Sequence, residues 1–322
     1  MADYDVFNGD ADGICALIQL RHAEPRNSTI VTGVKRDISL LKQIDVESGD
    51  RVTVLDISMD KNKTDLQRVL DAGAEVFYCD HHFAGDIPQA DNLHDLINTA
   101  ADTCTSLLVN GHLKGAYKEW AVAAAFGDNL KASALALAKQ TSLNESEVKS
   151  LESLGTYINY NGYGSSLDDL HFTPLELYKL MQPFTNPLHF IEQESEAYKR
   201  LEAGFINDMA SARAVDYDYA VQHCAVLTFP NEAWARRVSG VFSNDLANEN
   251  PDRAHAVLTS KANGNYLVSV RAPLNNKTGA DELCMQFPTG GGRKAAAGIN
   301  DLPADMLGDF ISALGKRYGN ES

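Results

Sequence analysis

The chain has 322 residues, of which 44% are hydrophobic, and a formal net charge of −16. This length is enough for two domains that each bury a core. No apolar stretch approaches the roughly 20 residues that span a bilayer, and the acidic N-terminus, residues 1–5, lacks the basic region of a secretory signal. The sequence therefore predicts a cytoplasmic protein without a membrane partner.

The negative charge is shared unevenly along the chain. Residues 1–215 carry 18 Lys/Arg and 32 Asp/Glu, whereas residues 216–322 carry 10 and 12. Such an acidic chain lacks the broad basic surface that binds long duplex DNA, although a few local cations can still hold a small phosphorylated ligand. The five cysteines are odd in number and show no C-x-x-C spacing, which argues against a disulfide framework and against a structural zinc site.

The first third of the chain alternates strand and helix patterns, which predicts a doubly wound and largely parallel sheet. The predicted elements are a strand at 5–7, a loop at 8–12, a helix at 13–22, strands at 29–34 and 51–57, a helix at 61–72 and a strand at 75–79. From 103 to 180 the pattern is mainly helical, and 190–210 predicts one long polar helix that connects two domains.

The last third predicts a second, smaller α/β domain. Strand patterns lie at 221–229, 254–259 and 266–271, and helical patterns lie at 236–248, 281–287 and 304–317. We therefore expect an α/β protein with an N-terminal domain at 1–190, a helical linker at 191–215 and a C-terminal domain at 216–322.

Acidic residues and two histidines follow successive predicted elements of the first domain: Asp10, Asp12, Asp56, Asp80, His81, His82 and Asp128. Carboxyl ends of parallel strands share one edge of a sheet, so these side chains are expected to meet there. Converging carboxylates repel each other unless cations neutralise them, and imidazole with carboxylate suits a divalent metal. Simpler interpretations stay open: an Asx-rich turn for Asp10 and Asp12, and helix caps for Asp56 and Asp128.

The order of these residues resembles the four motifs of the DHH phosphoesterase family: Asp10-x-Asp12-Gly13, Asp56, Asp80-His81-His82 and Gly127-Asp128. Residues 266–271 and 290–298 resemble the two signatures of the associated DHHA1 domain. The overall size is similar to the short-oligonucleotide nucleases and phosphoadenosine-phosphate phosphatases of the family rather than to its larger single-strand DNA exonucleases. The resemblance implies a catalytic DHH domain at 1–190 and a substrate-binding DHHA1 domain at 216–322.

The resemblance also implies a chemistry and a role for each residue. Two divalent ions, usually Mn²⁺ with Mg²⁺ or Co²⁺ as alternatives, would hydrolyse short oligonucleotides or small nucleotide phosphates with metal-activated water. Asp56 would bridge the ions, Asp10 would bind one, and Asp12, His81 and Asp128 would bind the other. His82 would act beside the phosphate, and Asp80 would orient the histidines.

Two positions depart from the family pattern. Asn8 stands where a histidine is usual, and its carbonyl oxygen is a weaker ligand for manganese than imidazole, so one metal site is expected to be looser. Arg293 also replaces a histidine, and arginine can grip phosphate through a bidentate fork. We expect Gly290, Gly291, Gly292 and Arg271 to contact the same anion, the alternatives being a flexible loop before a helix for the glycines and a surface ion pair for Arg271.

Other functions remain open at this stage. Asn8 and Arg293 are also compatible with a nucleotide-binding or sensor protein that has weak hydrolytic activity, and the motifs suit a polyphosphate or pyrophosphate hydrolase too. The expected partner is a short oligonucleotide or a small phosphorylated nucleotide, and assembly as a homodimer is left open. The aromatic and glycine-rich run 159–164 is interpreted either as a site lining or as packing.

Overall fold

The computed structural model describes residues 1–319 and divides into two compact units, Met1–Ala203 and Gly204–Ser322. The boundary lies inside the long helix α9 (Ser195–Arg213). Within the described residues, no helix is both long and apolar enough to cross a membrane.

Unit 1 is built on a five-stranded parallel sheet, which confirms the predicted doubly wound architecture. Its strands are β1 (Asp3–Phe7), β2 (Thr29–Thr32), β3 (Arg51–Leu55), β4 (Glu75–Asp80) and β5 (Leu93–Ile97). The strand order is β2-β1-β3-β4-β5, with every neighbouring pair parallel. The chain winds outwards in both directions from β1 and β3, so the carboxyl ends of these two strands form the switch point where folds of this kind bind ligands.

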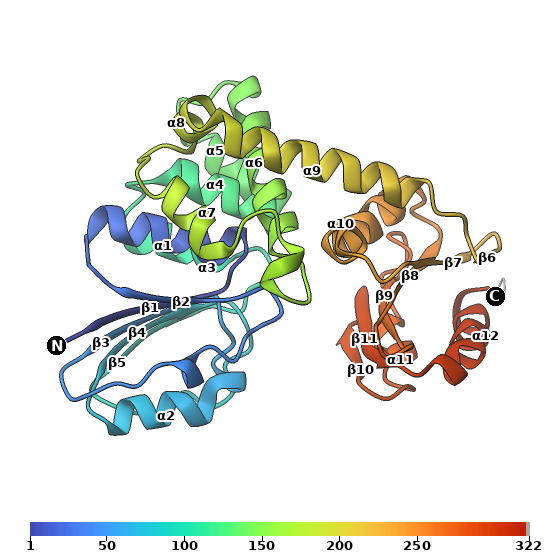
Figure 1. The fold of residues 1–322 in the computed structure, drawn as a ribbon, viewed down its shortest axis with the longest axis horizontal. Helices are drawn as coiled ribbons and strands as arrows, with labels where there is room; N and C mark the ends of the chain where they lie inside the picture. Colours follow the sequence, from blue (N-terminus) through green and yellow to red (C-terminus); the bar gives the residue numbers. More distant parts are fainter. Residues whose placement is uncertain (320–322) are drawn as a thin grey trace. The chain divides into compact units, whose positions relative to one another are not determined.

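Helices cover both faces of this sheet (Figure 1). On one face, α2 (Lys63–Asp71) packs Leu66, Val69 and Leu70 into a core with the buried valines of β1, β3 and β4. On the other face lie α1 (Ala11–Ala23) and α3 (Thr105–His112). The remaining helices of the unit are α4 (Lys118–Gly127), α5 (Lys131–Ala138), α6 (Glu145–Gly162), α7 (Pro174–Met181) and α8 (Pro187–Gln193).

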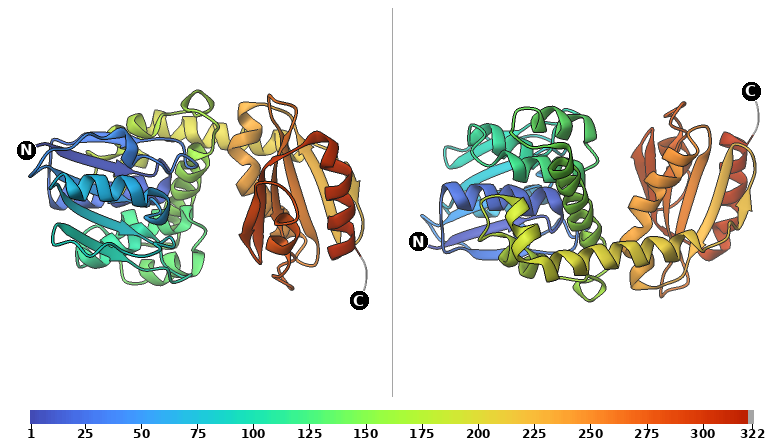
Figure 2. Two further views of the ribbon diagram at one scale, coloured as in Figure 1. Left: turned by 90° about the horizontal axis from the view of Figure 1, so that it is seen from below. Right: turned by 90° about the horizontal axis from the view of Figure 1, so that it is seen from above.

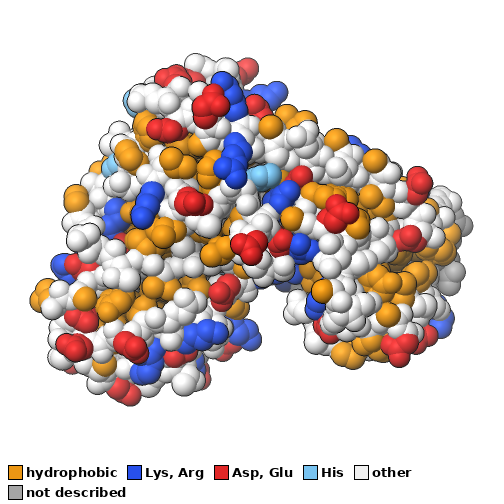
Figure 3. All heavy atoms as spheres, in the orientation of Figure 1, with side chains coloured by type: hydrophobic (Ala, Val, Ile, Leu, Met, Phe, Trp, Pro, Cys, Tyr) orange, Lys and Arg blue, Asp and Glu red, His pale blue; other side chains and the backbone are white. Residues whose placement is uncertain are grey.

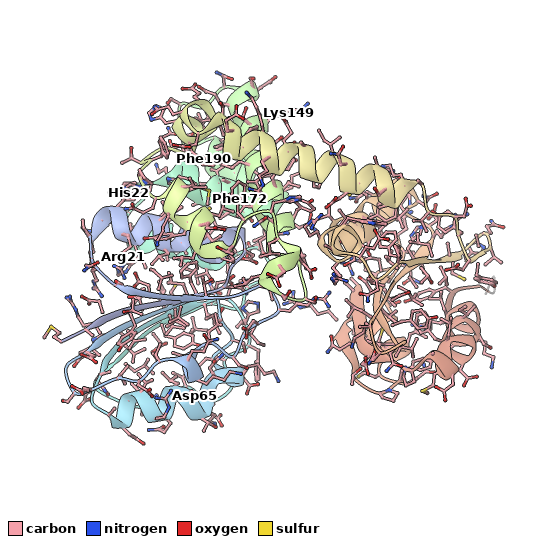
Figure 4. The ribbon with its side chains drawn as sticks, viewed as in Figure 1. Arg21, His22, Asp65, Lys149, Phe172 and Phe190 are labelled. Atoms are coloured by element: carbon pink, nitrogen blue, oxygen red, sulfur yellow. The ribbon has the colours of Figure 1, made fainter. Side chains whose placement is uncertain are left out.

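A buried ion pair fixes α1 on the sheet. Arg21 of α1, labelled in Figure 4, donates hydrogen bonds to both carboxylate oxygens of Asp5 on β1, at 2.6 and 2.8 Å. A further bond of 2.8 Å runs from Arg21 Nη2 to Thr53 Oγ1 on β3. Because a bidentate pair with satisfied donors has one geometry, it sets the position of α1 and hence of the acidic loop at its N-terminus.

Gly127 of α4 and Gly155 of α6 let these two helices approach closely. A Cβ on Gly155 would lie 1.9 Å from the carbonyl oxygen of Ala123 in α4. Gly155→Ala is therefore expected to destabilise the protein by about 2 kcal/mol, the usual cost of overpacking. Gly111→Ala in α3 is the matched control: no atom lies within 4 Å of the added Cβ, so a gain of about 0.5–1 kcal/mol is expected. Urea unfolding measures both, and equal effects would contradict the close approach.

Unit 2 contains a six-stranded sheet of order β10-β11-β9-β8-β7-β6. Neighbours β7 and β8 run parallel and the other pairs antiparallel. Helix α10 lies on one face and α12 on the other (Figure 2). The elements are β6 (Tyr219–Ala220), β7 (Cys224–Phe229), α10 (Ala233–Glu249), β8 (Ala254–Ser260), β9 (Tyr266–Arg271), α11 (Ala280–Cys284), β10 (Gly290–Arg293), β11 (Ala296–Leu302) and α12 (Leu307–Tyr318).

The structure corrects several predicted elements. The single helix expected at 190–210 is two helices, because the backbone of Glu194 is not helical and ends α8 before α9 begins. The strand expected at 221–229 begins later, as β7 at Cys224, because residues 221–223 form a tight reversal in which the Val221 amide bonds to the Cys224 carbonyl. Strands β5, β6, β10 and β11 were not predicted, since runs that are short, partly polar or glycine-rich have a low intrinsic strand preference.

Candidate metal centre

Three carboxylates meet around one imidazole nitrogen at the carboxyl edge of the unit 1 sheet. His81 Nε2 lies 3.4 Å from Asp56 Oδ1 and 3.9 Å from both Asp12 Oδ2 and Asp128 Oδ2. These carboxylates come from the start of α1, the end of β3 and the end of α4. Segments far apart in the sequence are thus brought to one point beside the switch point of the sheet.

The loop after β1 places two buried carboxylates. Asp10 Oδ1 accepts hydrogen bonds from the backbone amides of Asp12 and Gly13, at 3.0 and 3.1 Å, and so caps α1. Asp12 accepts from the amides of Thr105 and Ser106, each at 2.7 Å, at the N-terminus of α3. Amides at a helix N-terminus stabilise an anion, which keeps Asp12 in place while one of its oxygens faces His81. Thr105 and Ser106 were not predicted; Thr-Cys-Thr-Ser before an apolar helical run is the signal.

Asp56 ends β3 in a left-handed backbone conformation, with φ of +58°. Its amide bonds to the Cys79 carbonyl of β4 at 3.1 Å, and its Oδ1 accepts from Thr105 Oγ1 at 3.2 Å. A non-glycine residue rarely adopts this conformation, so the strain is stored where the carboxylate is aimed at the site. The helix-cap interpretation does not hold, because the next helical turn begins at Asp60 and is not capped by Asp56.

Asp128 lies at the C-terminal end of α4, where its amide closes the last turn on Ala124. A carboxylate at this end of a helix faces the negative end of the helix dipole, which is unfavourable unless a cation is near. Asp128 therefore occupies the C-cap position of α4, as one interpretation of the sequence held. Its side chain, however, points to His81 and not to the helix.

Asp80 is fully buried at the end of β4 and bonds to His82. The Asp80 Oδ1 to His82 Nδ1 distance is 2.7 Å, and the two histidine rings lie 4.4 Å apart between centroids. Since a protonated Nδ1 donates to the carboxylate, this bond fixes the ring and leaves Nε2 for another partner. Asp80 is thus bonded to His82 alone of the two histidines that it was expected to orient. His81 faces the carboxylates of Asp12, Asp56 and Asp128.

The pKa values divide the acidic residues into two groups. Burial, followed by the charges of Asp12 and Asp10, raises the pKa of Asp56 well above its ordinary value. Burial also raises the pKa of Asp128 to about 6, against the opposing effect of the Lys35 charge. For Asp10, burial is outweighed by the ion pair with Lys35, and the pKa is lowered. The Lys35 charge thus outweighs burial at Asp10, whereas burial prevails at Asp56 and Asp128.

That cation, Lys35, was not predicted from the sequence. Its Nζ lies 2.6 Å from Asp10 Oδ2 and 3.9 Å from Asp128 Oδ1. Although burial opposes protonation, the charge of Asp10 holds the pKa of Lys35 well above its ordinary value. Lys35 follows the end of β2, so its place at the carboxyl edge of the sheet was the available signal. Asn8 lies close by, and its Nδ2 donates to the Lys35 carbonyl at 3.3 Å.

The donor set around His81 suits a divalent transition metal, which favours imidazole together with carboxylate. Ligands of an ion at about 2.1 Å lie roughly 3 to 4 Å apart, which is the spacing seen around Nε2. Within residues 1–319 two groups could hold an ion, Asp12–His81–Asp128 and Asp56–His81–His82, and they share His81. Asp80 Oδ2 is buried without a hydrogen-bond partner, as expected where a nearby cation is needed.

In unit 2, Arg271 and Arg293 lie in one row across the sheet. Ala296 of β11 pairs with Arg293 on one side and with Arg271 on the other, so both arginines share a face. In the next row Gly291 pairs with Gly298, which pairs with Ser269, so the sheet has little side-chain bulk there. Arg271 is held by Asn244 Oδ1 at 2.7 Å and Ser269 Oγ at 3.0 Å, whereas Arg293 is exposed.

The glycine run is a strand rather than the flexible loop considered from the sequence. Residues Gly290–Arg293 form β10, the edge strand of the sheet. We had expected Gly290 to contact an anion. Its amide instead bonds to the Phe287 carbonyl at 3.1 Å and is therefore not free to do so. Gly292 has a φ of +144°, which only glycine adopts without strain.

Comparison of the sequence with protein-family models and with curated proteins finds no match. Solved structures do match. A DHH-domain protein described as a member of the s1p family of ribosomal proteins has a TM-score of 0.68 at 14% identity, covering 98% of this chain and 86% of its own. Exonuclease RecJ bound to manganese has a TM-score of 0.64 at 14% identity, covering 100% and 91%. The pGpG-specific phosphodiesterase PggH of Vibrio cholerae has a TM-score of 0.58 at 14% identity, covering 98% of each chain. The chain therefore has the two-domain α/β fold of DHH-domain proteins.

Proposed function

We propose that this chain is a divalent-metal-dependent phosphodiesterase of the DHH type that hydrolyses short oligonucleotides or small nucleotide phosphates. The observation that carries the proposal is the meeting of Asp12, Asp56 and Asp128 around His81 Nε2, at 3.4 to 3.9 Å. The fold is also that of an exonuclease bound to manganese and of a phosphodiesterase specific for pGpG, which supports the same class of reaction here. A divalent ion at this position supplies an activated water and neutralises charge on the phosphoryl group.

The protein side chains have separate tasks in this proposal. Asp12, Asp56, His81 and Asp128 hold the ion, and the two amides of α3 keep Asp12 aimed at it. His82 binds a phosphate oxygen or gives a proton to the leaving oxygen. Its pKa is raised by the hydrogen bond and charge of Asp80, which outweigh burial, so the ring stays protonated to higher pH than usual.

Unit 2 is proposed to hold phosphate groups of the substrate through Arg271 and Arg293. Arginine presents a fork of donors that matches phosphate oxygens, and the glycine row beside it leaves room for a ligand. On the face shown in Figure 3, acidic and basic side chains lie interspersed rather than in a basic stripe. Together with the net charge of −16, this favours a short substrate over a long duplex.

A panel of substrates tests the proposed function. Protein stripped with EDTA and reloaded with Mn²⁺ is offered a linear dinucleotide, 3′-phosphoadenosine 5′-phosphate, inorganic polyphosphate and a long duplex DNA. We expect turnover of one of the first two and none of the duplex. Turnover of polyphosphate alone would establish the second candidate, a polyphosphate hydrolase, and binding of a nucleotide without turnover would establish a sensor.

A further inference from the structure

The side chain of Lys35 lies among the acidic residues as an integral part of the centre. Besides Asp10 Oδ2 at 2.6 Å and Asp128 Oδ1 at 3.9 Å, its Nζ donates to Asn159 Oδ1 at 2.8 Å. Two carboxylates and an amide oxygen thus surround the ammonium group. Oxygens of these types are also the ligands of a hard divalent ion, so the ammonium group lies where such an ion would bind.

Backbone contacts fix the segment that carries this lysine, and an aromatic ring lies beside its ammonium group. Its amide bonds to the Gly162 carbonyl at 2.9 Å, its carbonyl accepts from Asn8 Nδ2, and its Nζ lies 5.2 Å from the centre of the Tyr163 ring. The end of α6 packs tightly here, since a Cβ on Gly162 would lie 3.1 Å from the Gly9 carbonyl oxygen. The side chain of Lys35 is only 20% exposed. The run 159–164, left open in the sequence, therefore positions the lysine.

The possible metal ligands are arranged around a different point. Both groups of histidine and carboxylate side chains that could hold an ion within the described residues contain His81, and neither contains Asp10. Nδ2 of Asn8 donates to the Lys35 backbone, and Oδ1 of Asn8 is buried without a hydrogen-bond partner. A divalent ion on Asp10 Oδ2 would meet an ammonium group already at hydrogen-bond distance from that oxygen, and two cations so close repel strongly.

We propose that the ammonium group of Lys35 replaces one of the two divalent ions, so that the centre binds a single divalent ion, held by Asp12, Asp56, His81 and Asp128. This inference rests on the proposed function, because it concerns the same centre. Asn8 then holds the segment that carries Lys35 through its Nδ2. The ammonium group of Lys35 neutralises Asp10 and is placed to attract the phosphate.

The test counts the ions. Metal-free protein is loaded with Mn²⁺, unbound ion is removed on a desalting column, and bound Mn is measured by elemental analysis. Electron paramagnetic resonance reports separately whether bound Mn²⁺ ions are isolated or coupled in pairs. The double variant Asn8→His/Lys35→Ala frees Asp10 and supplies an imidazole. The control is Lys139→Met, which replaces an exposed lysine at the end of α5.

We expect one isolated Mn²⁺ per chain in the wild-type protein and the control, and two coupled ions in Asn8→His/Lys35→Ala. Two ions in the wild-type protein would overturn the role of Lys35 but leave the proposed hydrolase intact. Zero ions would overturn both. One ion in a folded Asn8→His/Lys35→Ala protein would also overturn the inference, because the ammonium group would not be what excludes the second ion. The wild-type count needs no variant and decides the matter even if the double variant fails to fold.

Discussion

Asp56→Asn is expected to lower kcat by at least about 1000-fold with Mn²⁺ present. Asp56 Oδ1 is the carboxylate oxygen nearest to His81 Nε2, at 3.4 Å, and it also lies 3.9 Å from His82 Nδ1. Replacing its charge by an amide removes both an anionic ligand and the attraction that holds the ion between the two histidines. A loss of about 4 kcal/mol in transition-state stabilisation corresponds to that factor.

The same substitution is expected to make the metal-free protein more stable. Asparagine tolerates the left-handed conformation of this position and can still accept the bond from Thr105 Oγ1. Burial and neighbouring carboxylates raise the pKa of Asp56, so its ionised form costs stability as the pH rises through that pKa. At pH 7.5 a neutral side chain avoids this cost.

Turnover assays and thermal unfolding in EDTA measure the two effects, with the exposed Asp91→Asn as a control that should change neither. Activity close to that of the wild-type protein at saturating Mn²⁺ would contradict the assignment of Asp56 to the metal. A lower unfolding temperature in EDTA would contradict the electrostatic account of its raised pKa.

Four of the five strands of the unit 1 sheet, all except β5, were predictable because their sequences favour strands. Runs such as Val52–Leu55 and Val76–Cys79 are mostly apolar and consist largely of β-branched and aromatic residues, and each is followed by polar residues. Strand β10 gives no such signal: Gly-Gly-Gly-Arg is held as a strand only by its pairing with β11. The sequence also gives no signal for the break at Glu194 between α8 and α9, because the flanking residues continue in a helical pattern.

The acidic members of the centre were predictable for a topological reason, since each follows a strand or helix that ends at the same edge. Lys35 was missed because a single lysine after a weak strand is an ordinary surface pattern. Its importance comes from contacts with Asp10 and Asn159, two residues that are far apart in the sequence. Thr105 and Ser106 were missed for a similar reason, because they act through backbone amides, which every residue has.

Mn²⁺ is expected to raise the unfolding temperature of the metal-free protein by about 5 to 10 °C at pH 7.5, and by much less at pH 5. An ion at 100 times its Kd adds about 2.7 kcal/mol to the stability of the folded state. Each kcal/mol shifts the unfolding midpoint of a domain of about 200 residues, the size of unit 1, by about 2 to 4 °C. Below pH 6 the ion must displace a proton from Asp128, whose pKa is raised to about 6 by burial.

The raised pKa of Asp128 determines how the stability of the metal-free protein changes with pH. A raised folded-state pKa means that Asp128 favours folding while protonated, and that its contribution is lost as the pH rises through about 6. The metal-free protein therefore loses stability from this group between pH 5 and pH 7.5, and the ion restores it by supplying the missing positive charge. Differential scanning fluorimetry at both pH values, with and without Mn²⁺, measures the shift. In Asp128→Asn, the shift caused by Mn²⁺ should depend less on pH over this range. A shift of equal size at pH 5 and pH 7.5 in the wild-type protein would show that the ion binds away from Asp128.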